Sequence, residues 1–244
     1  MPAFILTNAS IIVGTTDISQ FTGSFTPTSS VAMQPATTFS SGGFTQVLPG
    51  LKSFTEAFSG LAAYGANEVS AVFNSAQLGT QQLVTVAPTG GLVAADPVSF
   101  GRFIIDNINA PGGSIGDVAS FDMSLTSDTA TAEGIIASPL TLRTSNFTGA
   151  VVAHVGPTAA QRMYIGLNVT AATGVGTMVV TIHSDPLVGF GTATLRATLP
   201  ATTAATAGWQ FVSVAGAITD GFWRATLTQT GAGNITSQVV IGVA

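Results

Sequence analysis

The sequence predicts an all-β protein built as an antiparallel β-sandwich, and three observations support this prediction. Short runs rich in Val, Ile, Thr and Phe recur along the chain, separated by Gly, Pro, Asn and Ser clusters that are typical of turns. From about residue 97 to the end, helices that would connect parallel strands are not visible between these runs. The clearest alternation lies at 117–125, where every second residue from Ala119 to Leu125 is apolar. This alternation predicts a strand with one buried and one solvated face.

The composition narrows the class of function. Only 7% of the 244 residues are charged, whereas 46% are hydrophobic and 28 are glycine. Ordinary globular chains carry about 25% charged residues. The six basic residues never cluster, so direct reading of DNA is not expected. Few charges remain to keep the exterior from associating, and we interpret the chain as one made for assembly.

Targeting and redox signals are also absent from the sequence. The N-terminus lacks a basic region followed by a long apolar run, so we expect no secretion signal. No segment approaches the roughly 20 uninterrupted apolar residues of a membrane helix, so we expect no membrane insertion. Because the chain has no cysteine, disulfides and thiolate metal sites are excluded.

Residues 1–95 are expected to form a smaller β module that carries a long arm. Ile11 to Val13 predict a strand that ends in a turn at 14–17, since Gly14 tolerates a positive φ. Residues 31–43 have too few alternating apolar positions for a buried strand, and Pro35 excludes a central one. A long, loosely ordered arm is therefore expected.

Ordering such an arm costs backbone entropy that burial of apolar side chains must offset. If those side chains do not fit the core of their own chain, a neighbouring copy is where they are buried. The alternative, equally weighted on these grounds, is that they pack inside a single-chain sandwich. The predicted self-assembly residues are Phe39, Phe44, Leu48, Pro49, Leu51, Phe54 and Phe58.

Residues 96–244 are expected to form a second, larger sandwich, either Ig-like or jelly-roll. We expect 162–170 and 177–183 to form one hairpin, and 222–228 and 235–243 to form another. A short helix is predicted at about 66–73, before the boundary between the two parts. The other predicted strands are 81–87, 97–106, 117–125, 192–199 and 209–214.

Two histidines are the first candidates for chemistry. His183 is followed by Ser184 and Asp185, but neighbours along one strand point to opposite faces and cannot converge as a nucleophile triad. A capped strand end or a satisfied polar position is the favoured interpretation. His154 lies in another apolar run. We therefore do not expect an enzyme.

Carboxylates are the second candidates. Asp106, Asp117 and Asp122 flank a Pro-Gly-Gly turn and offer oxygen ligands for calcium, but they follow no EF-hand spacing. Glu56 and Glu133 are the acids with strand context, yet nothing around them in the sequence would raise a pKa for glycoside hydrolysis. We expect no metal and no cofactor.

Aromatic residues in the C-terminal part allow two interpretations. They offer flat faces for a sugar ring, as in a glycan-binding β-sandwich. Sandwich cores also use large aromatics, and the apolar neighbours favour core packing. The residues concerned are Tyr164, Trp209, Phe222 and Trp223.

Residues 13–21, 37–39 and 44–52 together resemble the N-terminal pattern of the major tail (tail tube) proteins of long-tailed phages and prophages. In that family a glycine turn with D-[IL]-S is followed by a threonine-rich segment, a glycine-rich turn and a [FY]-x-x-x-L-P-G-L-K element. Residues 216–224 resemble, more weakly, the C-terminal β-sandwich of related tail proteins.

The resemblance implies a protomer whose copies form rings, usually hexamers, that stack into a tube. Its partners would be further copies and other tail proteins, with DNA passing through the lumen without specific binding. Its location would be the virion, with assembly in the host cytoplasm. Residues 28–49 match the loop that reaches the adjacent ring, although the N-terminal module is less acidic than the family's lumen. Head decoration or a distal tail or spike protein are the alternative virion roles.

Overall fold

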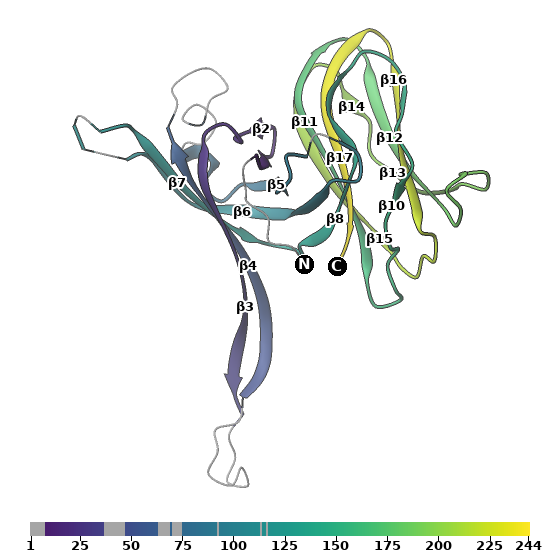
Figure 1. The fold of residues 1–244 in the computed structure, drawn as a ribbon. Coiled ribbons are helices and arrows are strands. Elements are labelled where there is room, and N and C mark those ends of the chain that lie inside the picture. Colours follow the sequence, from purple (N-terminus) through teal and green to yellow (C-terminus); the bar gives the residue numbers. More distant parts are fainter. Residues whose placement is uncertain are drawn as a thin grey trace. The chain divides into compact units, whose positions relative to one another are not determined.

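The computed structural model describes residues 8–36, 47–62, 69, 75–91, 93–112, 114–115 and 117–244. Strands make up most of these residues (Figure 1), and all pairs with a described register are antiparallel, which confirms the predicted fold class. A 3-10 helix, η1, spans Ser75–Gln77. No helix in the described ranges is long and apolar enough to span a membrane. The strands are β1 (Ser10–Val13), β2 (Thr16–Asp17), β3 (Thr22–Pro35), β4 (Val47–Leu61), β5 (Gln81–Ala87), β6 (Pro97–Gly112), β7 (Ser120–Ser127), β8 (Ala132–Arg143), β9 (Phe147–Thr148), β10 (Val152–Ala153), β11 (Arg162–Gly174), β12 (Thr177–Asp185), β13 (Thr194–Thr198), β14 (Thr202–Thr203), β15 (Gly208–Ala215), β16 (Phe222–Thr230) and β17 (Gly233–Val243).

The chain divides into two compact units, each made of separate stretches of sequence. Residues 8–20, 81–103 and 129–244 belong to the first, which we call the sandwich unit. The described parts of 21–80 and 104–128 belong to the second, the hairpin unit. This division does not coincide with the expected boundary between 1–95 and 96–244, because β1, β2 and β5 pair in one sheet with the C-terminal strands.

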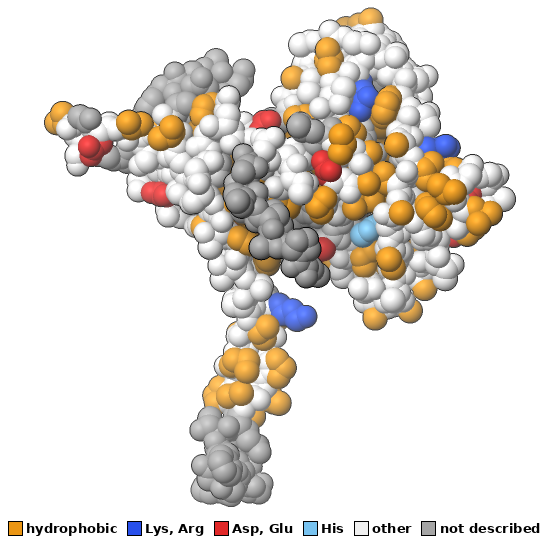
Figure 2. All heavy atoms as spheres, in the orientation of Figure 1, with side chains coloured by type: hydrophobic (Ala, Val, Ile, Leu, Met, Phe, Trp, Pro, Cys, Tyr) orange, Lys and Arg blue, Asp and Glu red, His pale blue; other side chains and the backbone are white. Residues whose placement is uncertain are grey.

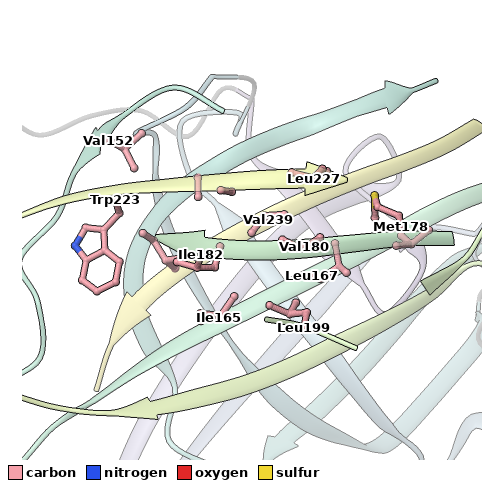
Figure 3. Close-up of a cluster of buried hydrophobic side chains, with 14 of the residues drawn as sticks. Val152, Ile165, Leu167, Met178, Val180, Ile182, Leu199, Trp223, Leu227 and Val239 are labelled. Carbon is pink, nitrogen blue, oxygen red and sulfur yellow. The ribbon is translucent and has the colours of Figure 1, made fainter. Parts of the chain in front are cut away.

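The sandwich unit consists of two sheets packed face to face. One has the strand order β15-β11-β17-β8-β6-β5-β1-β2, and the other has the order β10-β16-β12-β13, with β14 beside β12 and β9 beside β16. Alternate residues of β11 and β12 point between the sheets and are fully buried, as Figure 3 shows for Ile165, Leu167, Val180 and Ile182. This period of two is what a sheet with one covered face requires.

The two predicted C-terminal hairpins are wrong. Strands β11 and β12 lie in different sheets, and so do β16 and β17. The link from β11 to β12 and the link from β16 to β17 run side by side, because the backbone N–H of Val175 donates to the carbonyl oxygen of Ala232 at 2.8 Å. Glycine-rich links serve both hairpins and crossings between sheets, and Gly174, with φ +109°, occupies a conformation that favours glycine.

The hairpin unit is a sheet built on the antiparallel pair β3 and β4. The pairing runs from Thr22 opposite Gly60 to Pro35 opposite Val47. Strand β7 pairs with β4 on its other side, and β6 pairs with β7. The alternation predicted at 117–125 is confirmed, because Phe121, Met123 and Leu125 of β7 are all buried.

The expected loosely ordered arm is partly wrong. Residues 31–35, placed in the arm by their weak pattern and their proline, are the end of the 14-residue strand β3. Among the described strands β3 pairs only with β4, and a strand with one open edge tolerates proline where a central strand does not. Residues 37–46, with Phe39 and Phe44, lie outside the described residues, as does the predicted helix at 66–73 apart from Val69.

Candidate assembly surface

The outer part of the β3–β4 pair is a two-stranded ribbon, which we define as residues 30–35 and 47–53. Strand β7 accompanies β4 only as far as Thr55, which lies opposite Thr126. Beyond that point the described residues of β3 and β4 pair only with each other. Six residue steps at roughly 3.3 Å give the ribbon a length of about 20 Å. Figure 1 shows the two strands extending together in this way.

The register gives this ribbon an apolar face. Val31 lies opposite Lys52, Met33 opposite Pro49, and Pro35 opposite Val47. Residues two apart on a strand share a face, so these cross-strand pairs lie on one side. The pairing shifts between Val31 and Met33, where β4 carries one extra residue.

Large apolar side chains of the ribbon are exposed. Leu51, at the register shift in β4, is 86% exposed, and Leu48 is 60% exposed. Val31, Met33 and Val47 are also exposed. Figure 2 shows hydrophobic side chains gathered along this part of the chain. Exposed apolar patches are typical of interaction sites.

The base of the same hairpin is a packed core. The ring of Phe58 stacks on that of Phe25 with centroids 5.4 Å apart, and Phe58 is only 1% exposed. Phe54 is half-buried. Among the predicted assembly residues, Leu48, Pro49 and Leu51 lie exposed on the ribbon, whereas Phe58 fills the core of its own chain. For Phe58 the single-chain alternative is therefore the correct one.

The sequence interpretation considered Glu56 but missed that it is buried. Its side chain is fully buried on β4, between Pro27 on β3 and Leu125 on β7. The signal was present, because Glu56 is two residues from both Phe54 and Phe58 and so shares their face. Glu133, the other acid considered, is exposed on β8 of the sandwich unit.

The aspartates flanking the predicted turn make local hydrogen bonds. Asp106 accepts hydrogen bonds from the hydroxyls of Ser124 and Thr126. Asp117 accepts one from the backbone N–H of Ser114 at 3.3 Å. Within the ranges the structure describes, no three His, Cys, Asp or Glu residues gather as a metal site would require.

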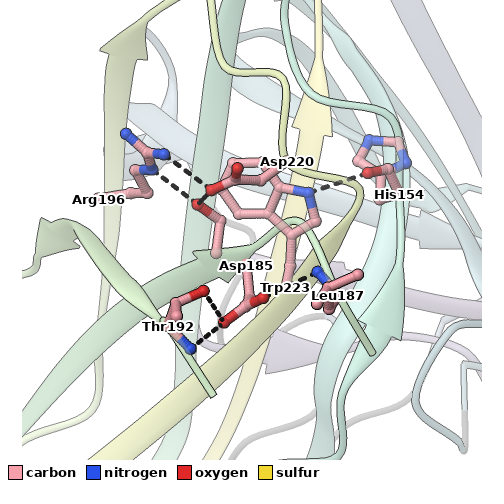
Figure 4. A network of polar contacts seen from close by, with 8 residues as sticks. His154, Asp185, Leu187, Thr192, Arg196, Asp220 and Trp223 are labelled. Carbon is pink, nitrogen blue, oxygen red and sulfur yellow. Dashed lines mark hydrogen bonds and ion pairs between the residues drawn. The ribbon is translucent and has the colours of Figure 1, made fainter. Parts of the chain in front are cut away.

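At the end of β12, Ser184 belongs to a polar network (Figure 4). Its hydroxyl donates to Asp220 at 2.6 Å and accepts from Nε of Arg196 at 2.6 Å. Arg196 also forms an ion pair of 2.8 Å with Asp220. The hydrogen bond from Ser184, and then that from Arg196, hold the pKa of Asp220 below its usual value.

Asp185 caps the end of the same strand. This fully buried carboxylate accepts hydrogen bonds from the backbone N–H groups of Leu187 at 2.8 Å and Thr192 at 2.7 Å. The bonds fix the loop that connects β12 to β13. The predicted capped strand end is thus confirmed, and Ser184 and Asp185 both have structural partners. Burial, followed by the nearby charge of Arg224, lowers the pKa of His183.

The aromatic residues of the sandwich unit are used for packing. Trp223 is fully buried. The ring of Tyr164 stacks on that of Phe211 at 5.3 Å. Trp209 is partly buried against the apolar cluster that contains Phe100. The prediction of core packing is confirmed for Trp223, whose rings are not accessible to a sugar.

Comparisons with known proteins complete the description. No family model matches the sequence, and no curated protein matches it. A chain of the virion of a native gene transfer agent particle superimposes with a TM-score of 0.39 and 17% identity, covering 54% of this chain and 98% of that one. A chain of the tail of an empty gene transfer agent particle, with C6 symmetry, gives 0.36 and 19%, covering 46% and 81%. The Dit protein of phage SPP1, from a hub adsorption apparatus, gives 0.36 and 10%, covering 97% and 99%.

Proposed function

We propose that this chain is a structural virion protein that assembles with copies of itself into stacked rings, forming a tail tube through which the genome passes. The observation that carries the proposal is the exposed apolar surface of the β3–β4 ribbon. Leu51 is exposed as well, and so is Leu48, which lies opposite Gln34 on the other face of the ribbon; the described residues of the same chain cover neither side chain.

The ribbon is expected to be more stable when another surface packs on it. An isolated two-stranded ribbon is marginally stable in water, so about 20 Å of unsupported hairpin gains stability when something packs on it. Burying apolar area contributes about 25 cal/mol per Å². Copies of the same chain are the partners present at the highest concentration during assembly of a repetitive particle.

One segment both carries the sequence resemblance and forms part of the exposed ribbon. Leu48, Pro49, Leu51 and Lys52, which belong to the tail-tube-like element, all lie on the ribbon. Folding of one chain does not need a solvent-exposed apolar pattern, whereas an assembly surface does. The scattered basic residues fit a conduit through which DNA slides without specific binding.

The test is the double variant Leu48→Ser/Leu51→Ser, examined by negative-stain microscopy and sedimentation velocity. Wild-type protein is expected to form rings or tubes, and the variant is expected to stay monomeric with unchanged far-UV circular dichroism. The matched control is Leu187→Ser/Val188→Ser, which removes two equally exposed apolar side chains from the β12–β13 loop. This control is expected to assemble.

Two results would contradict the proposal. One is wild-type protein that remains strictly monomeric at high concentration. The other is a ribbon variant that assembles as well as the control. Rings that never stack would exclude the tube and favour a role in the distal tail instead.

A further inference from the structure

We infer that the β3–β4 ribbon of one copy docks on the tip of the β6–β7 hairpin of another copy. This inference rests on the self-assembly proposed above and names the surface that receives the ribbon. We define the receiving tip by its described residues Ser114, Ile115, Asp117 and Val118. Both surfaces belong to the hairpin unit.

The two surfaces lie at opposite ends of one sheet. The first residue of β7, Ser120, pairs with Leu61 at the end of β4. The link from β6 to β7 therefore lies beyond that end of the sheet. The ribbon lies beyond the other end, where Pro35 of β3 pairs with Val47 of β4.

The receiving tip is apolar and acidic. Ile115 is fully exposed and Val118 is 73% exposed, with Asp117 between them in sequence. Apolar side chains this exposed, on a link of only seven residues, gain stability only by contact with another surface.

The ribbon offers the complementary chemistry. Lys52 lies on the same ribbon as the exposed apolar side chains, opposite Val31. Lys52 is the only Lys or Arg in the sequence of 21–80 and 104–128. In the docked pair, the apolar ribbon with its one cation contacts the apolar tip with its one anion. Charge complementarity then selects the register of docking.

The carboxylate of Asp117 is held in place for this contact. Its Oδ2 accepts a hydrogen bond from the backbone N–H of Ser114, whose carbonyl oxygen accepts one from the N–H of Asp117 at 3.0 Å. Such a turn restricts the side chain before a partner arrives. Less entropy is then lost on docking.

Another apolar loop, 186–193, is less suited to receive Lys52. It exposes Leu187 and Val188, but the carboxylate of Asp185 at its base is buried and bonded to the loop backbone. The guanidinium of Arg224 lies 4.2 Å from the centre of the Phe190 ring in the same loop. A lysine approaching this loop meets a cation.

Docking between opposite ends of one sheet has a consequence for symmetry. Each copy would give its ribbon to one neighbour and receive a ribbon from another. Such a heterologous contact repeats in one direction rather than closing on itself as a two-fold dimer does. It supplies the stacking direction that a tube requires.

Charge reversal tests the contact in the full-length protein. Lys52→Asp and Asp117→Lys, each alone, are expected to raise the concentration needed for stacking by about two- to fivefold, the range for one exposed ion pair. The combined variant is expected to return to the wild-type value. Asp122→Lys is the matched control, since it reverses an exposed acid on β7 away from the tip.

Rescue of Lys52→Asp by Asp117→Lys, but not by Asp122→Lys, supports the inference. Equal behaviour of the two lysine variants would overturn it. So would normal stacking by Ile115→Ser/Val118→Ser. These outcomes presuppose that wild-type protein stacks, so failure of the wild type to assemble would instead reject the proposed function.

Discussion

The indole Nε1–H of Trp223 donates a hydrogen bond of 2.9 Å to the carbonyl oxygen of His154. Trp223 begins β16 with its neighbour Phe222, and its partner strand β10 ends just before His154. The bond satisfies the only polar atom of a fully buried side chain. Trp223 thus joins the short edge strand β10 to the core of the sandwich unit.

Truncation of Trp223 is expected to destabilise the sandwich strongly. Trp223→Ala should lower the free energy of unfolding by about 3–5 kcal/mol, because it opens a cavity and leaves the carbonyl of His154 without its donor. Urea denaturation measures the change. Trp209→Phe, at a partly buried position, is the control and should cost less. A Trp223→Ala protein as stable as this control would contradict the packing described above.

The network around Asp220 predicts a loss of stability in acid. Its pKa is lowered in the folded protein by Ser184 first and then by Arg196, so its contribution to stability is present above the unfolded value of 3.8. That contribution is lost as the pH falls through the lower folded pKa. Denaturation curves of wild type and Asp220→Asn should therefore converge below about pH 4. Curves that stay equally far apart at all pH values would disprove this account.

His183 should titrate below its ordinary pKa of 6.5, because burial and then the charge of Arg224 disfavour its protonated form. The stability it contributes is complete above 6.5 and falls as the pH decreases toward the folded pKa. Arg224→Gln should raise the pKa of His183 in an NMR titration. His154, whose pKa is lowered by burial alone, is the internal control and should not move. A parallel rise at both histidines would indicate a general loosening instead.

The crossing between β11 and β12 should require glycine. A Cβ added at Gly174 would lie 2.8 Å from Cα of Gly233, and its φ of +109° is disfavoured for other residues. Gly174→Ala is therefore expected to cost about 1–3 kcal/mol in unfolding free energy. Gly208→Ala, where an added Cβ meets nothing within 4 Å, should be nearly neutral. Thermal unfolding of the two variants compares them, and equal midpoints would refute the prediction.

Some strands were predictable because one face of each is covered within the chain. The alternation from Ala119 to Leu125 identified the buried face of β7. Strand β8 was missed although it lies between β17 and β6. Its Pro139 obscured the pattern, and the structure accommodates this proline where the pairing with β17 shifts between Ser237 and Val239.

The candidate assembly surface was partly predictable. The sequence identified Leu48 and Leu51 as apolar residues in need of burial, and both are exposed in the single chain. It could not separate them from Phe58, which has the same apolar character but stacks on Phe25. Leu48 and Leu51 lie beyond the point where β7 stops pairing with β4, whereas Phe58 lies before it. That point is set by the pairing of strands more than 60 residues apart in sequence.

By itself, the sequence determined the fold class, the places where the chain turns and the scarcity of charge, because these depend on periodicity and composition. Only the tertiary structure decided that β11 and β12 cross between sheets, that Phe58 is core and that no described strand covers the ribbon. The physical reason is that a glycine-rich link fits both a hairpin and a crossing between sheets, and an apolar side chain fits both a core and an interface. Long-range strand pairing selects which link crosses, and it selects which apolar face is left for a partner.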